Sequence, residues 1–156
     1  MDSALNKRLS IEVRGIVQGV GFRPFVYNLA GKHGLSGFVT NTINGVYIEV
    51  EGENGNTERF VEELTANAPP LSEITDVKQF QIKPLEDTTF EIHKSSPKLG
   101  NKTLISPDVS ICDDCLDELF DTNNRRYLYP FINCTNCGPR FTIIENIPYD
   151  RPKTSM

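Results

Sequence analysis

Residues 15–25 read GIVQGVGFRPF, a glycine-rich segment that leads directly into an arginine and a proline. The ten residues from position 8, RLSIEVRGIV, alternate apolar and polar side chains, which predicts a half-buried strand. Between Phe22 and His33 the apolar residues recur at the spacing of one helical face, with Pro24 suited to the first turn and Gly34 to the stop. The quoted segment is therefore predicted to be a strand-to-helix turn.

The same reasoning extends the pattern to residue 94. LSGFVTN and VYIEVEG are predicted to be strands joined by TING, whose Asn44-Gly45 pair is a hairpin signal. NTERFVEELTANA is predicted to be a helix capped by Asn56 or Thr57, ITDVKQFQI is predicted to be a fourth strand, and FEIHK extends the sheet at an edge. The order β-α-β-β-α-β predicts an α+β fold, a ferredoxin-like four-stranded antiparallel sheet with both helices on one face.

Length and charge limit the kind of protein. The 156 residues carry a net charge of −5, which argues against a nucleic-acid-binding surface and leaves room only for a local basic pocket. Because no apolar run reaches the length of a membrane span and MDSALNKRLS is no signal peptide, we expect a cytoplasmic protein without a membrane partner. Periodicity fades around KSSPKLGNKTLISPD, which predicts a domain at 1–94, a linker at 95–108 and a cysteine module at 109–156.

The glycine-rich turn has the composition of an anion site. Gly19 and Gly21 allow positive φ, so successive amides can converge on one point beside the positive end of a helix. Arg23 adds a planar fork that matches phosphate oxygens. On spacing alone such a turn is more often structural than functional. The predicted phosphate-binding residues are Gln18, Gly19, Val20, Gly21, Phe22 and Arg23.

All four cysteines lie in the C-terminal third, as CDDC at 112–115 and CTNC at 134–137. In a reducing compartment this spacing predicts a structural zinc site with Cys112, Cys115, Cys134 and Cys137 as ligands and no catalytic role. The alternative is two redox pairs, whose usual thioredoxin-like context is missing. A short helix is expected to pack through Leu116, Leu119 and Phe120, and a small core is expected from Phe131, Ile132 and Phe141.

VRGIVQGVGFR followed by GFVTN resembles the signature of the acylphosphatases over about the first 92 residues. The resemblance implies hydrolysis of an acyl phosphate at a backbone cradle formed by residues 18–22. It also implies that the catalytic residues are Arg23, which binds the phosphate, and Asn41, which orients the attacking water. The alternative is that Asn41 is a turn or bulge residue beside Thr42 with a structural role only.

The acylphosphatase-like segment followed by CDDCLDELFDTNNRRYLYPFINCTNCGPRFTI resembles the N-terminal region of the hydrogenase-maturation carbamoyltransferases. That resemblance implies cleavage of carbamoyl phosphate to carbamate, and in the full-length family transfer of the carbamoyl group to a partner protein with a C-terminal cysteine.

The family is several times longer, with a second pair of Cys-x-x-Cys knuckles, so this chain is expected not to complete the transfer alone. If each metal in the full-length family is bound by Cys-x-x-Cys pairs from both groups of cysteines, the metal site of this chain is incomplete. The alternative function is a non-catalytic anion-binding scaffold whose zinc module docks a partner protein.

Overall fold

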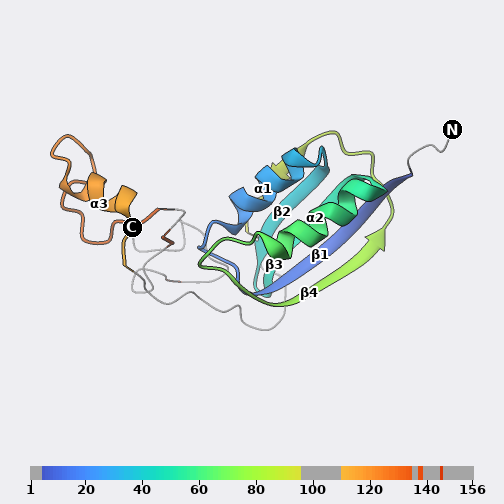
Figure 1. Ribbon diagram of the computed structural model, residues 1–156, viewed down its shortest axis with the longest axis horizontal. Coiled ribbons are helices and arrows are strands. Elements are labelled where there is room, and N and C mark those ends of the chain that lie inside the picture. Colours follow the sequence, from blue (N-terminus) through green and yellow to red (C-terminus); the bar gives the residue numbers. More distant parts are fainter. Residues whose placement is uncertain (1–4, 96–109, 135–136, 139–144, 146–156) are drawn as a thin grey trace.

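The computed structural model describes residues 5–95, 110–134, 137–138 and 145. The N-terminal part is a single sheet with two helices on one of its faces (Figure 1). The elements, in chain order, are β1 (Asn6–Ile16), α1 (Phe22–Lys32), β2 (Ser36–Thr42), β3 (Gly45–Glu53), α2 (Asn54–Ala66), β4 (Glu73–Ile82), β5 (Phe90–Ile92) and α3 (Asp113–Phe120). The ferredoxin-like prediction is confirmed. The predicted linker at 95–108 lies outside the described residues, apart from Ser95.

The sheet has the strand order β4-β1-β3-β2-β5. Strands β1 and β2 both run antiparallel to the central β3, and β4 runs antiparallel to β1. The FEIHK segment does extend the edge: β5 pairs with β2, and it does so in the parallel sense. The four predicted strands are therefore joined by a short fifth one, and the sheet is mixed.

The core lies between the sheet and the two helices. Leu9, Ile11 and Val13 of β1 are buried on the helix side, as their alternation predicts. Val26 and Phe60 face them from α1 and α2 and have no exposed surface. Burying each such side chain contributes about 1.5–3 kcal/mol. The remaining core side chains are Val17, Val20, Phe22, Leu29, Ala30, Leu35, Val39, Val46, Ile48, Val50 and Leu64.

The hairpin turn between β2 and β3 is displaced by one residue from the prediction. Its two loop residues are Ile43 and Asn44, and Gly45 already pairs with Thr42. A Cβ on Gly45 would lie 2.1 Å from Val13 O, so glycine is needed where β3 passes close to β1. The glycine therefore serves strand packing as well as the turn.

Helix α2 also begins earlier than predicted. It starts at Asn54, with Glu53 at the N-cap and no side-chain cap, so Asn56 and Thr57 lie inside the first turn. The Thr57 hydroxyl donates to Asn54 O at 2.8 Å and is satisfied there.

An ion cluster centred on the buried side chain of Arg8 lies on the other face of the sheet. Arg8 is 1% exposed, and its guanidinium donates to Glu49, Glu51 and Asp87 at 2.6–2.8 Å. The backbone N–H groups of Leu85 and Glu86 each donate a hydrogen bond to the Glu51 carboxylate at 2.9 Å. These bonds fasten residues 85–87 across the end of the sheet opposite to the β1–α1 turn.

The C-terminal part has a small core of its own. Cys115, Ile132 and Cys137 are buried together, with Leu119 and Tyr129 packed against them. The predicted packing of the α3 face is only partly correct, because Leu116 and Phe120 are exposed while the cysteine takes the inward position. Phe131 is likewise exposed, whereas Phe141 lies outside the described residues. None of the helices in the described part of the chain has the length and apolar character that a membrane span requires.

Candidate functional site

The glycine-rich turn connects β1 to α1 as predicted. Gly19 has a φ of 70° and Gly21 a φ of 79°, both in the left-handed region that glycine adopts without strain. Gly21 is the N-cap of α1, and the Phe25 N–H donates to its carbonyl at 3.2 Å. The first turn carries no acidic side chain, so the positive end of the helix is not neutralised locally. A turn of this shape suits an anion.

The side chains of the turn divide into anchors and the arginine. Val20 and Phe22 are each 2% exposed and belong to the main core, so only their backbone amides remain for a ligand. Phe22 also packs edge-on against Phe25, with ring centroids 5.7 Å apart. Arg23 is the second residue of α1 and is half-buried. The turn is thus held by its apolar side chains, and the predicted cradle can consist only of main-chain groups at these two positions.

Sheet topology brings Asn41 to the end of the sheet at which the turn lies. Because β1 and β2 are both antiparallel to β3, they run in the same direction, and their C-terminal ends meet at one edge. Val46 of β3 pairs with Val13 on one side and with Asn41 on the other. Asn41 lies two residues after the core residue Val39, so it shares the helix-side face, and it is 2% exposed.

Gln18 joins these two parts. Its side chain is 4% exposed, and its Nε2 donates to Thr42 O at 2.6 Å and to Gly45 O at 2.9 Å. The turn that carries Arg23 is therefore hydrogen-bonded to the hairpin that carries Asn41. The sequence pattern predicted a role for Gln18 in the cradle but not this side-chain role. The available signal was a lone polar side chain between Val17 and Gly19 in an otherwise apolar turn.

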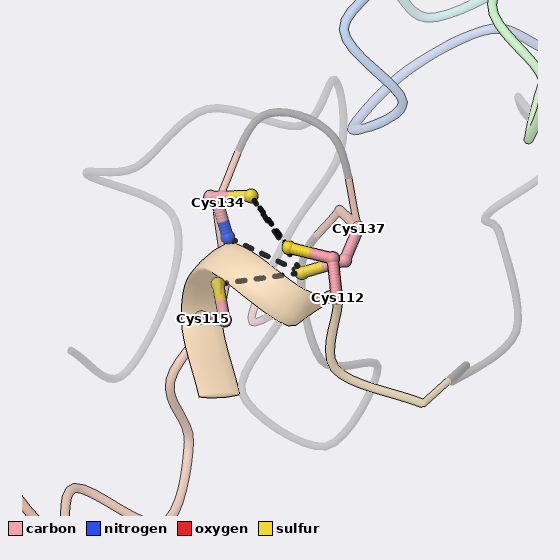
Figure 2. A group of neighbouring side chains, drawn as sticks. All are labelled: Cys112, Cys115, Cys134 and Cys137. Atoms are coloured by element: carbon pink, nitrogen blue, oxygen red, sulfur yellow. Dashed lines mark hydrogen bonds between the residues drawn. The ribbon is translucent and has the colours of Figure 1, made fainter. Parts of the chain in front are cut away.

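The four cysteine sulfurs converge (Figure 2). Sγ atoms of Cys112 and Cys134 are 3.5 Å apart, those of Cys115 and Cys137 are 3.8 Å apart, and all four lie within 4.8 Å of one another. A tetrahedral ion with bonds of about 2.3 Å needs sulfur separations of about 3.8 Å, so the donor set fits a closed four-thiolate metal site. The chain's own cysteines therefore offer four potential ligands, and all four are free thiols rather than disulfides.

The thiols differ in acidity. Burial opposes ionisation of Cys137, but backbone N–H groups of Cys112 and Cys134 donate to its sulfur and lower its pKa to about 7. Burial raises the pKa of Cys115, and neighbouring sulfurs raise it further. A cation is what allows such a crowded set of thiols to ionise together, because it replaces the repulsion between thiolates with attraction.

Residues 9–92, more than half of the chain, match the acylphosphatase family. The chain belongs to the acylphosphatase family. An acylphosphatase from Thermotoga maritima is 40% identical over 90 residues, which are 56% of this chain and 99% of that protein. The turn, Arg23 and Asn41 all lie inside the acylphosphatase module.

Residues 111–144 match a second family, the HypF finger, so the four-cysteine cluster belongs to a zinc-finger family. The probable carbamoyltransferase HypF of Methanocaldococcus jannaschii is 50% identical over 146 residues, 92% of this chain. A crystal structure of full-length HypF in the phosphate- and nucleotide-bound form superposes with a TM-score of 0.88 at 52% identity over 97% of this chain. The chain corresponds to the N-terminal region of these proteins and spans about a fifth of their length.

Proposed function

We propose that the acylphosphatase module binds an acyl phosphate at the β1–α1 turn and hydrolyses it. The observation that carries the proposal is the double hydrogen bond of Gln18, which ties the anion-binding turn to the strand end that presents Asn41. The parallel course of β1 and β2 supports it, because the turn that leads to Arg23 and the strand end that carries Asn41 then lie at the same end of the sheet.

The chemistry is built from positioning and charge. Arg23 and the amides of residues 18–22 bind the phosphoryl oxygens and stabilise their charge in the transition state. The Asn41 side chain holds a water in line with the bond from phosphorus to the acyl oxygen. The water oxygen bonds to phosphorus, the phosphorus–acyl-oxygen bond breaks, and its electrons leave with a carboxylate. The water's protons pass to the products. Because a carboxylate leaves as a stable anion, no strong general acid is needed.

Carbamoyl phosphate is the substrate we propose, because the relatives that match most of this chain are named carbamoyltransferases. Hydrolysis then yields phosphate and carbamate. In a full-length protein the carbamoyl group would pass to a hydrogenase-maturation partner with a C-terminal cysteine. The chain spans about a fifth of the relatives' length, so the reaction proposed for it is the hydrolytic step.

Zn²⁺ is the metal we propose for Cys112, Cys115, Cys134 and Cys137. Four thiolates at tetrahedral spacing leave no open coordination position, so the ion's contribution is structural. Free thiols in such a cluster persist in a reducing compartment, which supports a cytoplasmic location. The proposed division of the chain stays 1–94 for the acylphosphatase module, 95–108 for the linker and 109–156 for the zinc module.

The rival function is an anion-binding scaffold without catalysis, and substitution distinguishes the two. Arg23→Ala and Asn41→Ala are each expected to lower kcat for carbamoyl or acetyl phosphate by about 10²- to 10³-fold. Arg59→Ala on the exposed side of α2 and Asn6→Ala at the exposed start of β1 serve as matched controls with unchanged rates. If wild type hydrolyses neither compound faster than buffer, the module is a scaffold.

A further inference from the structure

Gly138, which directly follows the second Cys-x-x-Cys pair (the second knuckle, Cys134 and Cys137), contacts Gly19 in the proposed anion-binding turn. A Cβ atom on Gly138 would lie 2.3 Å from Gly19 O, so the two glycine backbones meet with no room for a side chain between them. Gly138 is buried and has a φ of 74°. In Figure 2 a blue segment from the N-terminal part of the chain lies on the same side of the cysteine cluster as Cys137. The two modules therefore touch at the turn predicted to hold phosphate.

Gly138 is also tied to the cysteine cluster. Its N–H donates to Cys134 O at 2.9 Å, which closes the knuckle. The Cys134 N–H donates in turn to Cys137 Sγ at 3.4 Å. An ion that fixes the sulfurs of Cys134 and Cys137 thereby fixes the position of Gly138.

The point of contact on the turn is a carbonyl. When successive amides of a glycine-rich turn converge on an anion, the carbonyls between them point outward. The Gly138 backbone packed against the Gly19 carbonyl opposes rotation of the neighbouring peptide planes and so keeps the amides directed at one point. Gly19, with its left-handed φ of 70°, is the kind of residue that otherwise moves easily.

We propose that Gly138 is a positioning residue for the phosphate site and that the metal-bound knuckle holds the turn in its anion-binding conformation. The proposal rests on the proposed function, since it assumes that the turn binds phosphate. Coupling between two sites is reciprocal. Metal at the cysteines must tighten phosphate binding, and phosphate must tighten metal binding by the same factor, on the order of 5- to 100-fold.

The test measures inorganic phosphate affinity by calorimetry on the zinc-loaded chain and on three variants. Gly138→Ala adds the clashing Cβ, and Gly138→Asn adds it in a residue that tolerates a left-handed backbone. Gly34→Ala is the matched control, because Gly34 has a φ of 63° and nothing within 4 Å of its Cβ position. Zinc content is measured for every sample, and KM and kcat for carbamoyl phosphate are measured alongside.

We expect both Gly138 variants to bind phosphate at least 5-fold more weakly, with full zinc content and with KM raised more than kcat is lowered, and Gly34→Ala to bind as wild type does. Equal phosphate affinity of wild type and Gly138→Ala overturns the proposal and leaves the phosphate site intact. Absence of phosphate binding to wild type overturns the proposed function together with the coupling.

If a Gly138 variant loses zinc, the wild-type chain decides. Its Zn²⁺ affinity is measured by chelator competition with and without saturating phosphate. An increase of at least 5-fold supports the coupling, and equal affinity overturns it.

Discussion

The side-chain amide of Gln18 lies 2.6 Å from the carbonyl oxygen of Thr42 and donates a hydrogen bond to it. Thr42 directly follows Asn41 in β2, and Gln18 directly precedes Gly19 in the β1–α1 turn, the proposed anion site. One buried side chain therefore sets the distance between the two parts of the proposed active site.

Replacing Gln18 with alanine tests this link. The variant leaves the carbonyls of Thr42 and Gly45 without that donor, so we expect a loss of about 1–3 kcal/mol in unfolding free energy. Displacement of the turn from Asn41 is expected to lower kcat/KM for acyl phosphate by about 10- to 100-fold. Gln79→Ala, at an exposed position of β4, is the control. An active-site role is refuted if Gln18→Ala loses stability and keeps full kcat/KM.

Arg23→Lys separates charge from geometry. Lysine keeps the positive charge but offers a point charge in place of the two-pronged fork. We therefore expect a rate between those of wild type and Arg23→Ala, with KM for acyl phosphate raised. Steady-state kinetics of the three proteins measures this. A lysine variant as active as wild type would show that only net charge matters at this position.

Glu51→Gln is expected to destabilise the chain in a pH-dependent way. Burial opposes ionisation of Glu51, but hydrogen bonds from the Leu85 N–H, Arg8 and the Glu86 N–H hold its pKa below the ordinary value. A group with a lowered folded pKa stabilises the fold above its unfolded pKa, about 4.3, and loses that contribution as the pH falls through the folded pKa.

At neutral pH we expect Glu51→Gln to cost about 1–3 kcal/mol, because Arg8 keeps two other carboxylates. Below pH about 4.3 the difference from wild type should shrink. Urea unfolding across pH measures both, with the exposed Glu62→Gln as the control. A difference independent of pH would contradict the assigned role of the ionised carboxylate.

Cys115→Ser is expected to abolish stoichiometric metal binding, because it removes one of four converging ligands. Wild type should hold one zinc per chain by elemental analysis, and Asp113→Asn, exposed beside the knuckle, should hold the same amount. Because metal displaces thiol protons, zinc affinity should fall as the pH is lowered. Less than half a zinc per chain in wild type at neutral pH would contradict a complete site.

Gly45→Ala tests the close approach of β3 to β1. The added Cβ would lie 2.1 Å from Val13 O in a backbone with a φ of 144°, so the strand must move. We expect a loss of at least about 1–3 kcal/mol, measured by chemical unfolding. Gly55→Ala, in α2 with open space around its Cβ, is the matched control and is expected to stabilise the chain by about 0.4–1 kcal/mol. Equal effects of the two would contradict the packing role.

Local patterns predicted the fold because the burial of this chain follows simple periods. Ile11 and Val13 are buried where alternation placed them, and Val26 and Leu29 are buried where helical spacing placed them. The cysteine spacing likewise predicted a cluster that the described residues form. The parallel pairing of β5 with β2 could not be predicted from local pattern, because it depends on how the chain returns across the sheet after β4.

Polar side chains were the hardest to place. Arg8 alternates with core residues as a surface residue would, yet it is buried because Glu49, Glu51 and Asp87 surround it. Gln18 is likewise buried by partners 24 and 27 residues away in the chain. The contact of Gly138 with Gly19 joins two modules, and no spacing rule connects them. Such roles follow from tertiary neighbours rather than from local pattern.

The most direct test of the phosphate site is a titration of the isotopically labelled chain with inorganic phosphate, followed by NMR of the backbone amides and the Arg23 Nε–H. We predict saturable shifts concentrated in residues 18–23 and lost in Arg23→Ala. Shifts that leave these residues unchanged while phosphate binds elsewhere, or that persist undiminished in Arg23→Ala, would contradict a site built from this turn and its arginine.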